Sequence, residues 1–176
     1  RFLRALYYYH LMDCFGNIPF LTVVSSEPAP QATRQEVYNF IESELLDIEG
    51  TMSAPMTGTY GRADQAAAWM LLARLYLNAE VYTGTAQWQK AAEYAQKVMN
   101  SAYKLHTTGS HDAVNNKDWS AYQMLFMGDN GENGAQCEAI LPLLQDGITT
   151  TSWGTSLFLM ASTFKDDMTI VGAATN

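Results

Sequence analysis

Apolar residues recur every three or four positions in four stretches of the chain, which is the spacing of one face of an α-helix. The pattern predicts helices over residues 1–15, 34–49, 63–81 and 87–101. Thr33 and Glu36 have the spacing of a capping box, in which each side chain bonds the other residue's backbone N–H, so the second helix should begin there. Gly16 and Gly50 follow the first two stretches and should end them.

The same spacing groups the apolar residues of each helix on one side. In the second stretch the apolar face consists of Val37, Phe40, Ile41, Leu45 and Ile48. In the first stretch it consists of Leu3, Leu6, Tyr7, His10, Leu11 and Cys14. Because His10 lies on this apolar face, we expect it to be an interior histidine rather than a metal ligand.

The third and fourth stretches predict two antiparallel helices joined by a Gly/Thr turn. The third carries the opening half of the tetratricopeptide motif, with alanine at the glycine position: Trp69, Leu72, Ala73 and Tyr76. Small residues let two helices approach closely, so the contact should pass through Ala73, Ala91 and Ala95. The three larger residues of the motif should be buried, and Trp88 should cover the open end of the helix pair.

The pattern changes after residue 105, where no long helix is indicated. We expect a polar loop or short helix at 106–120, one or two helical turns at 119–127, a turn at 129–134, an extended segment at 138–144 and a loop with strand at 147–164. Pro142 favours the extended form, because proline disrupts a helix interior. The predicted fold is therefore mainly α, with tetratricopeptide-like helical hairpins, irregular loops and a little short strand after residue 105.

Composition narrows the class of protein. The chain has 176 residues, 48% of them hydrophobic, which suits one domain with a real core. Its net charge of −8 argues against a nucleic-acid partner. It has no apolar run of the roughly 18 residues that a membrane-spanning helix needs. The chain begins within a helical pattern and ends in a loop-like tail, so we expect it to be an internal piece of a longer protein.

Candidate catalytic and metal-binding residues are few. His106 and His111 lie in a polar loop, at a spacing that does not place metal ligands on one face of a helix. No phosphate-binding glycine loop, nucleophile motif or HExxH motif is present. Neighbouring acids such as Asp166 and Asp167 lack the opposed arrangement of a glycosidase. We therefore expect no catalytic residue, no metal and no cofactor.

Aromatic residues outside the predicted helices are the remaining candidates for binding. Trp153 lies in a hydroxyl-rich stretch and Trp119 in a polar one, where a tryptophan has less core to join. Flat rings framed by hydroxyl and amide groups suit sugar rings. We expect Trp153 first and Trp119 second to stack on sugar, with hydrogen-bonding groups from Thr151, Ser152 and Asn130. The alternative is that each tryptophan anchors its loop to the core.

Six short segments occur in an order and at spacings that are found together in one family. They are residues 4–19 with the Tyr7-Tyr8-Tyr9 run, 33–42, 61–63, 67–76, 88–98 followed by 103–105, and 138–141. Through them the chain resembles the SusD/RagB family of outer-membrane nutrient-binding lipoproteins. The resemblance spans the whole chain, which would be well under half of a family member.

The resemblance implies a SusD-like α/α superhelix that binds a ligand without catalysis. In that family the helical repeats pack against a TonB-dependent (SusC-like) outer-membrane transporter, and loops on another side hold the ligand, usually a glycan or oligosaccharide. Residues 1–104 would be the scaffold, and residues 105–176 the loop-rich ligand side, of one partial domain. The resemblance also implies a surface-exposed lipoprotein of the cell outer membrane, although Cys14 lies within a helix and not in a lipidation motif.

Two other functions stay open on the residues alone. A tetratricopeptide-type scaffold that binds a peptide or a partner protein would need several tandem repeats with polar residues turned inward, and one clear helix pair is present. A helical enzyme would need a cluster of carboxylates or histidines, which the sequence does not show.

Overall fold

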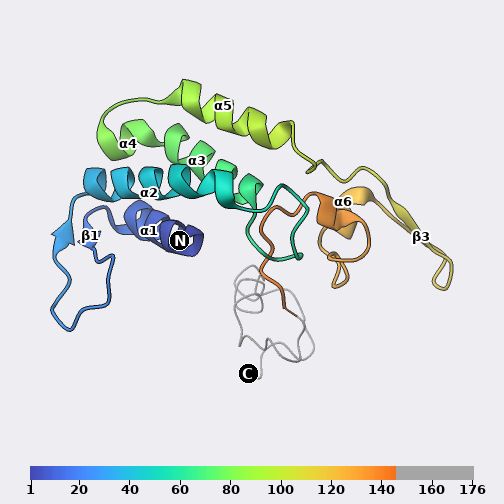
Figure 1. Ribbon diagram of the computed structural model, residues 1–176. Coiled ribbons are helices and arrows are strands. Elements are labelled where there is room, and N and C mark those ends of the chain that lie inside the picture. Colours follow the sequence, from blue (N-terminus) through green and yellow to red (C-terminus); the bar gives the residue numbers. More distant parts are fainter. Residues whose placement is uncertain (146–176) are drawn as a thin grey trace, which may run out of the picture. The chain divides into compact units, whose positions relative to one another are not determined.

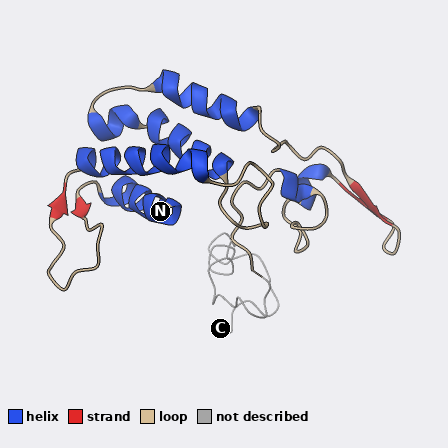
Figure 2. Cartoon of the chain, in the orientation of Figure 1, coloured by secondary structure: helices blue, strands red, loops and turns tan. Residues whose placement is uncertain are grey.

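The computed structural model describes residues 1–145, which are mainly helical (Figures 1 and 2). The helices are α1 (Phe2–Phe15), α2 (Arg34–Ile48), α3 (Gln65–Leu77), α4 (Ala79–Thr83), α5 (Trp88–Met99) and α6 (Ala121–Met124), with 3-10 turns at Glu49–Thr51 and Ala135–Cys137. The strands form two antiparallel ribbons, β1 (Ile18–Pro19) with β2 (Gln31–Ala32) and β3 (Ser110–Asp112) with β4 (Lys117–Trp119). The predicted mainly α fold is confirmed.

By its contacts the chain divides into two units, Arg1–Pro142 and Leu143–Asn176. Only residues 143–145 of the second unit are described, and all of these helices and strands belong to the first unit. The division into a scaffold over residues 1–104 and a ligand side over residues 105–176 stays a prediction.

The ends of the helices follow the local sequence. At α2, Thr33 Oγ1 accepts from the Glu36 backbone N–H at 3.3 Å and Glu36 Oε2 accepts from the Thr33 N–H at 2.8 Å, so the predicted capping box is present. The single helix expected over residues 63–81 is interrupted at Asn78, whose side-chain amide donates to the Arg74 carbonyl oxygen. Asparagine side chains compete in this way for backbone groups, and α3 ends there before α4 begins.

The long helices pack on one another in the order α1, α2, α3 and α5, and the contact between α3 and α5 is the most extensive (Figure 1). Tyr76 of α3 and Tyr94 of α5 lie with their ring centroids 5.5 Å apart, and the Tyr76 hydroxyl donates to Glu42 of α2 at 2.8 Å. Ala73, Ala91, Leu72 and Tyr76 are buried and Ala95 is partly buried. The predicted antiparallel helix pair is therefore confirmed.

The expectations for two tryptophans are wrong. Trp69 is only partly buried, because it lines a shallow hollow with Pro55 and with Lys97, whose Nζ lies 5.7 Å from the ring centroid. Trp88, the first residue of α5, is 61% exposed and does not cover the helix pair. The buried residues of α5 are Ala91, Tyr94 and Val98, so the predicted face with Ala91 is present and Trp88 lies off it at the start of the helix.

Helix α1 buries a different face from the one expected. Its buried residues are Phe2, Ala5, Tyr9 and Met12. The expected face is exposed at Leu3, Tyr7, His10, Leu11 and Cys14, and only Leu6 packs partly against the core. Because α1 is apolar around almost its whole circumference, spacing alone does not select the face that meets α2. The interior position expected for His10 is therefore wrong, whereas the predicted face of α2 is confirmed, with Phe40 only partly buried.

Residues 105–145 differ from the expectation in detail. The polar stretch expected to be a loop or short helix contains the β3–β4 ribbon, which the Asp112 side chain closes by accepting from the backbone N–H groups of Val114 and Asn115. The expected helical turn is α6. Residue 138 lies in a turn and residues 140 and 141 form a bend after the 3-10 turn Ala135–Cys137, and no residue of 138–144 belongs to a strand.

Candidate functional site

A cavity of about 750 Å³ lies beside α6, between that helix, the β3–β4 ribbon and the turn after α6. We call it the α6 hollow and define it by six of its lining residues, Asp112, Trp119, Tyr122, Phe126, Asp129 and Asn133. Three aromatic side chains therefore meet three carboxylate or amide groups around one opening.

The β3–β4 ribbon sets the position of Trp119. Residues opposite each other in the ribbon share a face, which places Trp119 opposite Ser110 and Lys117 opposite Asp112. Lys117 and Trp119, two positions apart, share that face, and the Lys117 Nζ lies 3.9 Å from the centroid of the Trp119 ring. The other face carries His111 and Asp118, which interact at 2.7 Å across the strands. The tryptophan is half-buried, and Lys117 lies over its ring.

Helix α6 and the turn after it supply the other two rings, Tyr122 and Phe126 respectively. Ser120 and Gln123 form a capping box that starts the helix directly after β4. Tyr122 lies in α6 and Phe126 in the turn that follows, where the Phe126 N–H donates to the Gln123 carbonyl oxygen, and the two ring centroids are 5.1 Å apart. They are 71% and 72% exposed, so both rings present most of their surface to solvent.

The polar groups of the hollow are fixed by their own hydrogen bonds. Asp112 accepts from the Asn115 side chain at 2.7 Å and from two backbone N–H groups, which together hold its pKa below the usual range. The Asn133 side chain donates to the Met124 carbonyl oxygen and to Asp129, both at 3.1 Å. An ionised carboxylate and a fixed amide beside exposed rings can bind hydroxyl groups of a ligand whose apolar face stacks on the rings.

The structure brings together only some of the residues predicted to bind ligand. Trp119 lines the α6 hollow. Asn130 lies in the adjoining turn, where its side-chain amide donates to the Leu125 carbonyl oxygen at 2.8 Å. Thr151, Ser152 and Trp153 lie outside the described residues. Phe126 was not predicted to bind ligand, although it is an aromatic residue close to Tyr122 and outside the predicted helices.

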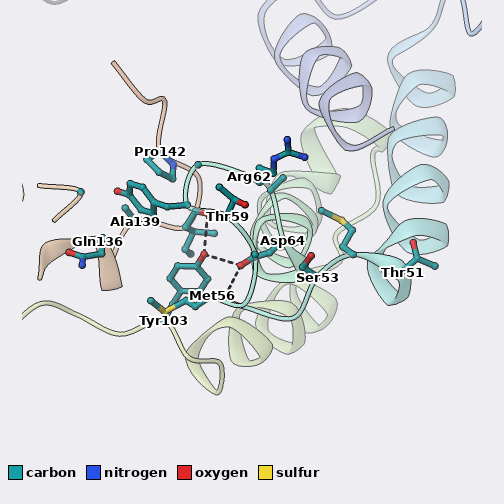
Figure 3. Close-up of a pocket in the computed structure, with 17 residues that line it drawn as sticks. Thr51, Ser53, Met56, Thr59, Arg62, Asp64, Tyr103, Gln136, Ala139 and Pro142 are labelled. Atoms are coloured by element: carbon teal, nitrogen blue, oxygen red, sulfur yellow. Dashed lines mark hydrogen bonds between the residues drawn. The ribbon is translucent and has the colours of Figure 1, made fainter. Parts of the chain in front are cut away.

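A second cavity, of about 720 Å³, lies between residues 51–64, residues 131–142 and Tyr103 (Figure 3). We call it the loop pocket. At its base the Asp64 carboxylate is 3% exposed and begins α3 by accepting from the backbone N–H groups of Ala66 at 2.9 Å and Ala67 at 3.2 Å. Its other oxygen accepts from the Met56 backbone N–H and from the Tyr103 hydroxyl, both at 2.9 Å (dashed in Figure 3).

The backbone of the loop pocket is held in an unusual conformation. Met56 has a φ of 61°, which non-glycine residues rarely adopt, and its N–H is the group that Asp64 binds. Gly61 has a φ of 84° and makes the turn that leads into α3. The Tyr103 hydroxyl also contacts the Ile140 carbonyl oxygen at 3.4 Å, so one buried carboxylate and one phenol connect three segments.

Neither cavity has the features of a metal centre, and no part of the described chain spans a membrane as a helix. Among residues 1–145, no three His, Cys, Asp or Glu side chains gather closely enough to hold a metal ion. Within the same residues, every helix is too short or too polar to cross a bilayer.

Comparison with known proteins agrees with this architecture. A SusD-like family model, described as "Starch-binding associating with outer membrane", matches residues 1–77. The chain is 46% identical over 164 residues to the starch-binding protein SusD of Bacteroides thetaiotaomicron, an alignment that covers 93% of this chain and 27% of that protein. The chain is thus SusD-like in sequence, which confirms the resemblance that its motifs indicate.

A solved structure supports the fold. A SusD-like protein from Bacteroides fragilis matches with a TM-score of 0.55 at 22% identity, over 76% of this chain and 24% of that one. The chain therefore spans about a quarter of the length of the relatives that it matches.

Proposed function

We propose that this chain is part of a non-catalytic protein that binds nutrient glycans at the surface of the outer membrane, and that the α6 hollow contacts the sugar. One observation carries the proposal: Trp119, Tyr122 and Phe126 meet the fixed polar groups of Asp129 and Asn133 around a single cavity. The identity with a starch-binding protein supports a neutral glucan as the ligand.

The test is binding of a starch oligosaccharide, maltoheptaose, by the chain and by its Trp119→Ala variant. Stacking on one aromatic ring contributes roughly 0.5–1.5 kcal/mol beyond area burial, so we expect millimolar binding that the variant weakens roughly two- to tenfold. Trp88→Ala is the matched control, because Trp88 is 61% exposed on α5 and does not line the hollow. Equal loss in both variants, or none in Trp119→Ala, would contradict the proposal.

We further propose that the glycan passes to a TonB-dependent, SusC-like transporter that the helices contact. The support is the exposed apolar stripe of α1, where Leu3, Tyr7 and Phe15 are 55%, 64% and 72% exposed. The same stripe favours the second candidate function, a scaffold for a partner protein. A photo-crosslinker at Tyr7 in cells that make the protein should capture the transporter, whereas one at Val114, 93% exposed in the ribbon turn, should not. If the crosslinker at Tyr7 captures a protein other than the transporter and the crosslinker at Val114 does not, the scaffold function is favoured.

A further inference from the structure

Two charged side chains line the loop pocket, and only one of them is hydrogen-bonded to the described protein. Arg62 and Asp64 are the charged residues among those that line it. Each Asp64 oxygen accepts two hydrogen bonds, from Ala66 and Ala67 on one side and from Met56 and Tyr103 on the other. The carboxylate therefore has no acceptor capacity left for the neighbouring guanidinium.

The Arg62 side chain is exposed and has no hydrogen bond or ion pair with any residue that the structure describes. Arg1 and Arg4, by contrast, are both bonded to Glu44. A guanidinium offers five donors in a planar fork, and its best-matched partner is a carboxylate. The one carboxylate among the lining residues, Asp64, is already fully hydrogen-bonded, so the pocket presents a cation without an anionic partner among the described residues.

The rest of the pocket is suited to a polyol rather than to a bare anion. The hydroxyls of Ser53, Thr59 and Tyr60 line it and make no hydrogen bond with a described residue. Hydroxyls both donate and accept, as sugar hydroxyls do. Met56 and Ile140 add apolar surface. The Asp64 hydrogen bonds fix the loop before any ligand arrives, which lowers the entropic cost of binding.

We propose that the loop pocket is a second sugar site, distinct from the α6 hollow, and that it binds an acidic sugar unit, a uronic acid, whose carboxylate pairs with Arg62. The hydroxyls of Ser53, Thr59 and Tyr60 bind the sugar hydroxyls. The chain would then accept a glycan that carries acidic units, although its own net charge is −8. This second site does not depend on the proposed neutral-glycan site.

Methionine methyl groups report on the two cavities separately. Met52 and Met56 line the loop pocket, whereas Met124 and Met127 line the α6 hollow. In protein labelled with ¹³C at the methionine methyl groups, glucuronate should shift the Met52 and Met56 resonances saturably and leave those of Met124 and Met127 in place. Maltoheptaose should do the reverse. Failure of one titration therefore leaves the other proposal standing.

The contribution of the Arg62 charge to glucuronate binding is measured with the Arg62→Gln variant, and Arg74→Gln is the matched control. Arg74 is an exposed arginine of α3 that lies away from the pocket. Because an exposed charge pair contributes roughly 0.2–1 kcal/mol, Arg62→Gln should weaken glucuronate binding roughly two- to fivefold, and Arg74→Gln should leave it unchanged. In the unmodified protein, added NaCl should weaken glucuronate binding, because the guanidinium is exposed.

Two further ligands test which part of glucuronate the pocket recognises. Glucose, which lacks the carboxylate, and acetate, which lacks the sugar ring, should both bind more weakly than glucuronate. The proposal is overturned if glucuronate leaves the Met52 and Met56 resonances unshifted, or if Arg62→Gln binds it as the unmodified protein does. Acetate binding as tight as that of glucuronate would overturn the assignment to a sugar.

Discussion

The Tyr103 hydroxyl donates a 2.9 Å hydrogen bond to the carboxylate of Asp64, across 39 positions of sequence. Asp64 is at the same time the N-cap of α3, so the start of the central helix and the chain after α5 are connected through a single buried side chain. Burial and this hydrogen bond raise the pKa of Tyr103 above its ordinary value, which keeps the phenol protonated as a donor at neutral pH.

Removing the carboxylate should therefore cost more than removing the phenol oxygen. Asp64→Ala deletes an N-cap and leaves the Met56 N–H and the Tyr103 hydroxyl without their acceptor, a loss of roughly 2–4 kcal/mol. Tyr103→Phe removes one hydrogen bond only, roughly 0.5–1.5 kcal/mol. Urea unfolding of the two variants measures the difference. Equal losses would mean that Asp64 contributes nothing to the loop beyond its bond to Tyr103.

The contact between α3 and α5 should not tolerate a larger side chain at Ala73. Ala73 shares a helix face with Trp69 and Tyr76, which meet Lys97 and Tyr94 of α5, and it is 8% exposed. Ala73→Leu should lower the free energy of unfolding by roughly 1–3 kcal/mol through overpacking.

The same substitution at Ala92 is the control for Ala73→Leu, because Ala92 is exposed on α5. Ala92→Leu should change the free energy of unfolding by less than roughly 0.5 kcal/mol. A thermal melt that Ala73→Leu leaves unchanged would show that the helices are not in close contact at this point.

Acid should weaken the packing of α1 on α2 through one carboxylate. Glu44 of α2 accepts from Arg1 at 2.8 Å and from Arg4 at 2.6 Å, and chiefly the Arg1 hydrogen bond lowers its pKa from 4.5 to about 2. A carboxylate whose pKa is lower in the folded state stabilises the fold fully above its unfolded pKa. That contribution should be lost as the pH falls from about 4.5 towards 2.

The contribution of the Glu44 charge is tested by measuring the unfolding free energies of the unmodified protein and of Glu44→Gln between pH 7 and pH 2. The variant should be less stable than the unmodified protein at pH 7. The difference in unfolding free energy should shrink as the pH falls from about 4.5 towards 2. Glu80→Gln, an exposed change on α4, should follow the unmodified curve throughout. A gap of constant size at all pH values would show that Glu44 acts through shape and not through its charge.

Helices were predictable from the sequence where spacing and end signals agreed. The Thr33–Glu36 capping box and the apolar face of α2 are both present, because they depend on neighbours within one or two turns. The exposed side of α1 was not predictable, since Leu3 and Tyr7 on one side are as apolar as Phe2 and Tyr9 on the other. Which side is buried depends on α2, and helix spacing carries no information about that partner.

The candidate sites were predictable only in part, for a related reason. Trp119 stood out because it lies in polar sequence, and it does line a cavity. The loop pocket left no local signal, because Asp64 and Tyr103 lie 39 positions apart and meet only in the fold. A hydrogen bond of that kind depends on how α3 and α5 pack, which residue spacing does not specify.

Trp153 stays the first residue that the sequence predicts to stack on sugar, and Trp119 is the second. Trp153 follows Thr151 and Ser152, whose hydroxyls suit a polyol. In a longer protein that contains this chain, we expect measurable glycan binding that Trp153→Ala weakens several-fold without changing the melting temperature, whereas the chain of 176 residues alone should bind weakly. A single stacked ring accounts for roughly 0.5–1.5 kcal/mol, so neither tryptophan alone should abolish binding. If Trp119→Ala weakens binding and Trp153→Ala does not, the α6 hollow is the sugar site and Trp153 anchors its own loop.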